Sequence, residues 1–177
     1  MDLNLKERSA LISGASKGIG VAIAEAFAAE GCHLHLVART RADLESARDR
    51  IASRHGVKVE IHPMDLAERG RATELAAKCP DIDILVNNAG SIPRGTVEEI
   101  DEERWRAAWD LKVFGYINMT REFFRLMKAR RSGVIINVIG NGGERLDSGY
   151  IAGGAGNAAL MAFTRALGGS SAEVGVR

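Results

Sequence analysis

A glycine-rich turn near the start of the chain constrains its fold more than any other stretch. The turn spans residues 13–20, between a short apolar segment (9–12) and an alanine-rich segment with good helix formers (21–30). Glycine permits tight turns and close approach to a ligand, and a helix start offers unpaired N–H groups to an anion. The order strand, glycine turn, helix therefore predicts a phosphate-binding turn. The alternative is a loop that needs glycines only for its backbone conformation and binds no phosphate. The predicted contacts are Gly14, Ser16, Lys17, Gly18, Ile19 and Gly20.

The rest of the chain alternates short apolar segments with helical ones. We expect strands at 9–12, 32–38, 57–62, 82–86 and 133–139, and helices at 21–30, 41–54, 68–78, 102–129 and 155–167. Strands that alternate with helices predict a parallel sheet covered on both faces. Right-handed crossovers then give a doubly wound, Rossmann-like α/β fold. We expect one dinucleotide-binding domain over residues 1–177.

Composition narrows the classes of partner. The net charge of +1 gives no electrostatic case for nucleic acid or for an anionic membrane. Cys32 and Cys79 have no metal-ligand spacing, nor do the four histidines, so we expect no metal site. The sequence shows neither a signal peptide nor an apolar run of membrane-spanning length, which favours a cytoplasmic protein.

Two motifs together resemble the short-chain dehydrogenase/reductase family. The turn reads G-x-x-x-G-x-G, with Ser13 where the family has Thr, and residues 87–90 match the family's N-N-A-G motif letter for letter. The resemblance implies a dinucleotide cofactor, hydride transfer to or from a small carbonyl or alcohol, and cofactor contacts at Asn87, Ala89 and Gly90. It also implies that residue 177 falls just before the sixth strand of a family member, so we expect a fold truncated there.

The end of the second expected strand bears on the choice of cofactor. Ala38 stands where NAD-preferring members of the family carry Asp, and Arg39 follows it. Arg39 and Lys17, two cations near the adenosine ribose, would suit a 2′-phosphate. The resemblance therefore implies NADP(H) in preference to NAD(H). The alternative for Arg39 is a solvated charge at a strand end.

Asp65 and Leu66 follow the third expected strand. In the resembled family this pair contacts the adenine ring, with the carboxylate accepting from the exocyclic amine. The alternative for Asp65 is an N-cap of the next helix. Both roles can be filled at once, by the carboxylate and by the backbone.

The catalytic positions depart from the family pattern. In the family a Tyr transfers the proton, a Lys four residues later lowers its pKa, a Ser positions the substrate, and an Asn in the long helix completes a proton relay. Matching the flanking sequence puts Gly140 at the Ser position, Gly153 at the Tyr, Asn157 at the Lys and Lys112 at the Asn. The alternative function is therefore a nucleotide-binding homologue without turnover, either a sensor or a structural subunit.

Two nearby side chains are candidates for the missing chemistry. Tyr150 lies three residues before Gly153, and Lys112 interrupts an apolar stripe of the long helix. Burial lowers the pKa of a lysine, so Lys112 could stand in for the missing Lys and activate Tyr150 as proton donor. The alternative is that Tyr150 packs its ring in a loop and Lys112 reaches solvent.

The long helix at 102–129 carries two apolar faces. Trp105, Trp109, Tyr116, Met119 and Phe123 form one face, and Val113, Ile117 and Phe124 form the other. One face can cover the sheet, and a second suggests a partner subunit. Because family members often pair through this helix and the one at 155–167, we expect a homo-oligomer.

Overall fold

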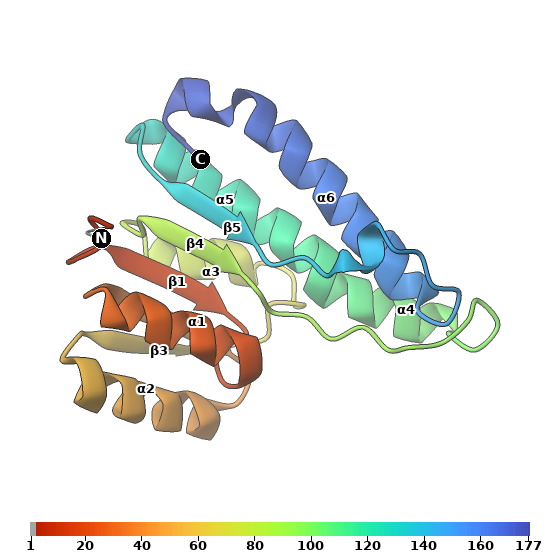
Figure 1. The fold of residues 1–177 in the computed structure, drawn as a ribbon, viewed down its shortest axis with the longest axis horizontal. Coiled ribbons are helices and arrows are strands. Elements are labelled where there is room, and N and C mark those ends of the chain that lie inside the picture. The colour runs from red at the N-terminus through yellow and green to blue at the C-terminus, as the bar shows by residue number, and fades with distance from the viewer. Residues whose placement is uncertain (1–2) are drawn as a thin grey trace.

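The structure, a computed structural model, describes residues 3–177 and contains a five-stranded parallel sheet in the order β3-β2-β1-β4-β5 (Figure 1). The strands are β1 (Ser9–Ser13), β2 (His33–Ala38), β3 (Val59–Pro63), β4 (Ile84–Asn87) and β5 (Val134–Asn137). The main helices are α1 (Gly18–Ala29), α2 (Arg41–His55), α3 (Arg71–Lys78), α4 (Glu102–Trp109), α5 (Gly115–Ala129) and α6 (Ile151–Ser171). This arrangement confirms the doubly wound α/β fold expected from the alternating pattern.

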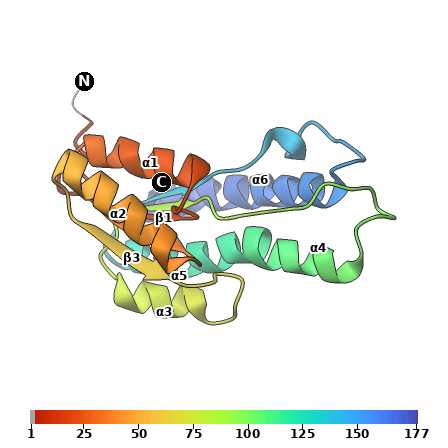
Figure 2. The ribbon, with the colours of Figure 1, turned by 90° about the horizontal axis from the view of Figure 1, so that it is seen from below.

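Helices cover both faces of the sheet, α1 and α2 on one side and α3 and α5 on the other, and α4 continues beyond the sheet (Figure 2). Successive residues of a strand point to opposite faces, and β1 divides its side chains accordingly. Ile12 joins a core with Leu44 of α2, whereas Leu11 joins a second core with Met119 and Phe123 of α5. Burial on both faces explains why the central strands β1 and β4 consist mostly of apolar residues.

The expected long helix is interrupted by a π-helical turn. Residues Asp110–Phe114 form this turn between α4 and α5, and Lys112 lies at its centre. Such π-turns are frequent at functional sites, because the extra residue per turn redirects a side chain. Apolar periodicity carries no signal for a single inserted residue, so the interruption was not predicted.

The helix expected at 155–167 is longer than its sequence suggested. It begins at Ile151, with Tyr150 as its N-cap, and ends at Ser171. The four residues before the expected start at 155 are therefore already helical. Glycines usually weaken a helix, but Gly153, Gly154 and Gly156 are buried here and permit close packing that offsets their low propensity.

The last residues of the chain pair with the outer side of β5. The Arg177 amide donates to the Gly133 carbonyl at 3.1 Å, and the Ile135 amide donates to the Arg177 carbonyl at 2.7 Å. The isolated bridge between Gly133 and Val176 is parallel. Residues 175–177 therefore lie where the expected sixth strand would begin.

The second apolar face of the long helix is largely covered by the chain itself. Val113 is buried in a small cluster with Leu160 of α6, and Ile117 packs against that cluster. Phe124 packs against the core under α3 and α5. These contacts remove the main argument from which a partner subunit was expected, although Phe114 in the π-turn remains 50% exposed.

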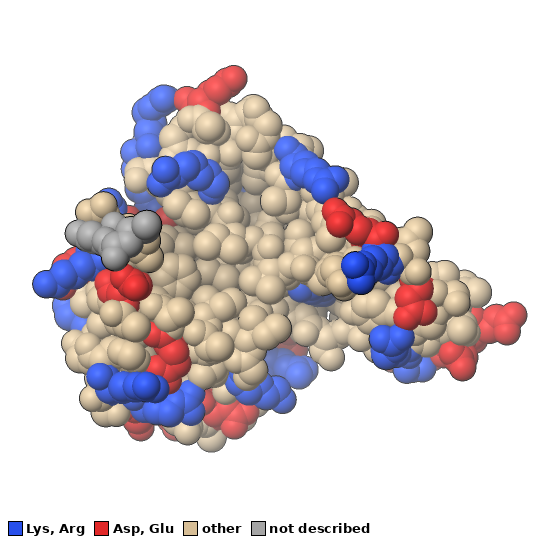
Figure 3. Space-filling model, in the orientation of Figure 1, with Lys and Arg blue, Asp and Glu red and all other residues tan. Residues whose placement is uncertain are grey.

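The surface carries charges of both signs. Figure 3 shows basic and acidic side chains interspersed around the face that α1 and α6 border, with uncharged surface between them. This mixture agrees with the small net charge of the sequence. Within residues 3–177, no helix has both the length and the apolar character that crossing a bilayer requires.

Candidate active site

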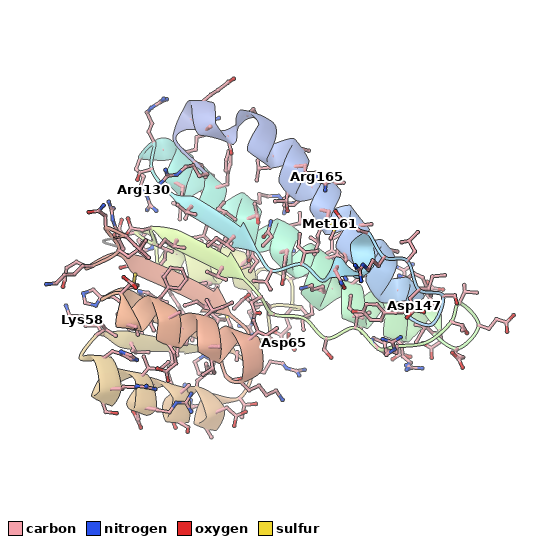
Figure 4. All side chains as sticks on the ribbon, viewed as in Figure 1. Lys58, Asp65, Arg130, Asp147, Met161 and Arg165 are labelled. Carbon is pink, nitrogen blue, oxygen red and sulfur yellow. The ribbon has the colours of Figure 1, made fainter. Side chains whose placement is uncertain are left out.

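The carboxyl ends of β1, β2, β4 and β5 border a cleft of about 630 Å³. The predicted contacts that line it are Gly14, Ser16, Lys17, Ile19, Arg39, Asp65, Leu66, Ala89 and Gly90. Lys112 and Gly140 line it as well, whereas Gly18, Gly20, Asn87 and Tyr150 do not. Figure 4 labels Asp65 at this end of the sheet, with Lys58 and Arg130 at the opposite end. A parallel doubly wound sheet binds ligands at this edge.

The three glycines of the turn have different roles. Gly14 and Gly18 adopt positive φ angles of 68° and 57°. A Cβ atom on Gly20 would lie 2.2 Å from the Gly14 carbonyl oxygen, so only glycine lets α1 approach the turn so closely. A Cβ atom on Gly18 would meet no atom within 4 Å, which leaves that side of the turn open to a ligand.

Replacing Gly20 by Ala is therefore expected to destabilise the protein by about 2 kcal/mol or more and to weaken dinucleotide binding. The added methyl group must displace backbone atoms that shape the turn. Urea unfolding and calorimetric titration with NADPH measure the two effects. Gly168→Ala, at an open position in α6, is the matched control and is expected to stabilise the protein slightly. Unchanged binding in Gly20→Ala would contradict the assigned role of the turn.

Side-chain hydrogen bonds join the glycine turn to residues 87–90. Ser13 Oγ accepts from the backbone amides of Asn88 and Ala89 at 2.9 and 3.0 Å. Asn88 Nδ2 donates back to the carbonyls of Ser13 and Gly14. Ser13 thus holds two strand ends together, a role that sequence reasoning missed although its place in the glycine motif marks it.

Asn87 lies behind the cleft and does not line it. It is fully buried, and its Nδ2 atom donates to Thr120 Oγ1 of α5 at 3.1 Å and to Asn137 Oδ1 of β5 at 2.9 Å. These bonds fix α5 and β5 against the end of β4. The amide therefore supports the walls of the cleft and does not line it, unlike the cofactor contact that the resemblance implied for Asn87.

Two exposed cations, one at the end of β2 and one at the start of α1, line the cleft. Arg39 follows β2 and Lys17 is the N-cap of α1; both are exposed, and within residues 3–177 neither forms an ion pair. Thr40 and Asp43, which follow Arg39 in the sequence, line the cleft as well. Sequence reasoning missed Asp43, although its place in the first turn of the helix after Arg39 could have revealed it.

Asp65 does not cap the next helix. Its Oδ1 atom accepts from the Ala67 amide at 3.0 Å, which closes a local turn, whereas α3 begins only at Arg71 with Gly70 as its N-cap. The N-cap alternative is therefore wrong. The local turn leaves Asp65 lining the cleft beside Leu66.

Lys112 reaches into the cleft from the π-turn. Its Nζ atom donates to Tyr116 Oη at 2.6 Å and to the Val138 carbonyl at 2.8 Å, and Tyr116 Oη donates to the same carbonyl. The side chain crosses Gly90, where a Cβ atom would lie 2.4 Å from Lys112 Cδ. Burial lowers the pKa of Lys112 to about 8 and raises the pKa of Tyr116. Lys112 can therefore exchange a proton near neutral pH.

Three of the four positions matched to the family's catalytic residues, Gly140, Asn157 and Gly153, take part in two contacts. Asn157 is buried, and its Oδ1 atom accepts from the Gly140 amide at 3.3 Å. The Tyr150 ring lies over Gly153, where a Cβ atom would lie only 2.0 Å from Tyr150 Cζ. The ring of Tyr150 thus occupies the volume that any side chain at position 153 would fill.

The structure does not join Tyr150 to Lys112. Among residues 3–177, Lys112 Nζ bonds to Tyr116 and Val138, and the Tyr150 ring contacts the Arg94 guanidinium at 5.6 Å from its centroid. Activation of Tyr150 by Lys112 therefore stays a prediction. Tyr116, which sequence reasoning assigned only to an apolar stripe, is the direct partner of Lys112.

Comparisons with known proteins agree on one family. A family model described as short chain dehydrogenase matches residues 8–177. A fatty acyl-CoA reductase of Acinetobacter baylyi is 37% identical over 97% of this chain, which spans 59% of that relative's length. A 2,3-dihydro-2,3-dihydroxybenzoate dehydrogenase of Bacillus subtilis is 30% identical over 98% of this chain and 67% of its own length.

A solved structure is similar along the whole chain. L-sorbose reductase of Gluconobacter frateurii, crystallised with NADPH and L-sorbose, superposes with a TM-score of 0.94 and 32% sequence identity. The match covers 100% of this chain and 69% of the reductase.

Proposed function

The chain belongs to the short-chain dehydrogenase family, an oxidoreductase family that binds nicotinamide dinucleotides, and on this basis we propose that it transfers hydride between NADP(H) and a small carbonyl or alcohol. The observation that carries this proposal is the cleft that joins the open glycine turn to Lys112 and Gly140. One end of that cleft offers donors to phosphate, and the other offers a protonated amine to a substrate oxygen. The dinucleotide, when bound, supplies the hydride.

The residues of the cleft fit a dinucleotide. Gly14, Ser16, Lys17 and Ile19 line the cleft around the start of α1, where unpaired N–H groups can receive a pyrophosphate, and Gly18 beside them leaves open space. Arg39 and Lys17 can receive a 2′-phosphate, and Asp65 can accept from the adenine amine. NADPH in the sorbose reductase structure supports the proposed preference for NADP(H).

A lysine, an asparagine and a tyrosine, residue types that transfer protons in the family, lie near the matched positions of this chain but at different places in the sequence. Lys112 stands at the family's Asn position, Asn157 at its Lys position, and Tyr150 lies over Gly153, at the family's Tyr position. We assign Tyr150 as proton donor and Lys112 as its electrostatic partner. In reduction the carbonyl carbon accepts hydride, and its oxygen takes the proton that Tyr150 releases. The charge of Lys112 stabilises the developing alkoxide and the phenolate.

A homo-oligomer that pairs through α4, α5 and α6 is part of the proposal. The exposed Phe114 ring in the π-turn supports it, because a half-exposed aromatic ring on this helix is suited to a contact with a second copy. Light scattering measures the mass of the particle in solution, and we expect a mass larger than that of one chain.

The function is tested by NADPH oxidation with a panel of small ketones, aldehydes and sugars. The unmodified chain is expected to turn over at least one class, and Tyr150→Phe is expected to lose about 100-fold or more in kcat with unchanged NADPH affinity. Phenylalanine keeps the ring over Gly153, so the variant removes only the hydroxyl group. NADPH binding without turnover of any substrate would instead indicate the nucleotide-binding, non-catalytic homologue.

A further inference from the structure

Away from the cleft, two histidines and a cysteine meet between the sheet and α3. His35 Nδ1 of β2 lies 3.0 Å from His62 Nε2 of β3, and Cys79 Sγ, at the end of α3, lies 3.5 Å from each of these nitrogens. The two imidazole rings stack with centroids 5.3 Å apart. Three atoms able to bind a metal thus form a small triangle, the His35–His62–Cys79 cluster.

The fold, not local spacing, creates this cluster. The parallel register pairs His35 with Glu60 and Val37 with His62, so both imidazoles point to the same face of the sheet. Cys79 is the C-cap of α3, and it is buried in the core that α3 and α5 share with that face. The three ligands come from three separate elements.

We propose that the His35–His62–Cys79 cluster binds one Zn²⁺ ion. Tetrahedral zinc with its usual bonds of about 2.0–2.1 Å to nitrogen and 2.3 Å to sulfur needs ligand atoms about 3.3–3.6 Å apart. The observed separations of 3.0, 3.5 and 3.5 Å differ from that range by only a few tenths of an ångström. Imidazole and thiolate are ligands of zinc, whereas calcium and magnesium select oxygen.

Glu60 can supply the fourth ligand. Its Oε2 atom lies 3.8 Å from His35 Nδ1, and its side chain is 67% exposed. An exposed carboxylate beside a mostly buried triangle gives the ion both an entry path and a fourth ligand. A water molecule can take the same position when Glu60 points to solvent.

Zinc binds neutral imidazole and thiolate, so the Cys79 thiol releases its proton to solvent as the ion binds. Bound zinc would join β2, β3 and the end of α3.

The proposal is tested on metal-free chain, which is prepared with a chelator that is then removed. The chain is titrated with Zn²⁺ in the presence of a chromophoric competitor, and Co²⁺ is substituted for Zn²⁺ in a separate sample. We expect saturation at one ion per chain and a thiolate-to-cobalt charge-transfer band. Zinc at about 100 times its Kd is expected to raise Tm by about 5–10 °C, because the unfolded chain lacks the site.

Matched variants identify the ligands. Cys79→Ser and His62→Gln are each expected to lose at least about 100-fold in zinc affinity, and Cys79→Ser loses the charge-transfer band. The controls Cys32→Ser and His55→Gln lie outside the cluster and are expected to bind as the unmodified chain does.

Two outcomes would overturn the zinc site. One is the absence of saturable binding, or of the cobalt band, in the unmodified chain, a result that does not depend on how well any variant folds. The other is unchanged affinity in a Cys79→Ser variant that circular dichroism shows to be folded.

Discussion

Lys112→Met is expected to reduce carbonyl turnover by at least about 100-fold at pH 7 and to raise the free energy of unfolding by about 1–3 kcal/mol. The loss of turnover follows from the proposed role of the cation, which sits in the cleft beside Gly90 and the Val138 carbonyl. The gain in stability follows because methionine, which has a similar length, replaces a desolvated charge with an uncharged side chain. Tyr116 still donates to Val138, so no buried carbonyl is left without a partner.

The pH dependence of that gain has a definite sign. Burial lowers the pKa of Lys112 to about 8 in the folded chain, from 10.5. Below pH 8 the amine is charged in both states, and the folded state bears the full desolvation cost. As pH rises from 8 to 10.5 the folded state gives up the proton first, so the cost disappears. The stability difference between Lys112→Met and the unmodified chain should therefore shrink across this window.

Two measurements test the role of Lys112. Urea unfolding at pH 7 and pH 10 gives the stability difference, and kcat between pH 6 and 10 should fall above pH 8 only when Lys112 is present. Lys128→Met, at an exposed position in the last turn of α5, is the control and is expected to change neither. Turnover that survives Lys112→Met would show that another group stabilises the alkoxide.

Arg39→Asp is expected to reverse the cofactor preference, with a combined shift of about 100- to 1,000-fold in the ratio of NADPH to NADH affinity. The guanidinium lines the cleft without an ion pair among the described residues, so it can bind a 2′-phosphate through two parallel hydrogen bonds. A carboxylate at that position repels the phosphate and can accept from ribose hydroxyls.

Calorimetric titration of both dinucleotides measures the shift. Arg41→Asp is the matched control, because Arg41 is an exposed cation two residues away that pairs with Glu45 and does not line the cleft. We expect its preference to remain that of the unmodified chain. Equal affinity of the unmodified chain for NADPH and NADH would contradict the assignment of Arg39 before any variant is made.

Local patterns in the sequence were sufficient for the fold and for many of the residues that line the cleft. Alternating apolar and helical segments predicted the parallel sheet, because strand and helix periodicities are properties of the chain itself. The turn at 13–20 and the motif at 87–90 are contiguous, so their glycines and small residues could be identified without knowing which elements pack together. Of the twelve predicted cofactor contacts, only Gly18, Gly20 and Asn87 do not line the cleft.

Only the tertiary structure decided what surrounds the reactive side chains. The π-turn directs Lys112 to Tyr116 and Val138, and the early start of α6 lays the Tyr150 ring over Gly153. The His35–His62–Cys79 cluster likewise has no spacing that a sequence search would detect. The physical reason is the same in each case. A desolvated amine, a packed ring or a metal triangle depends on distances between elements far apart in the chain, and these distances are set by strand register and helix packing.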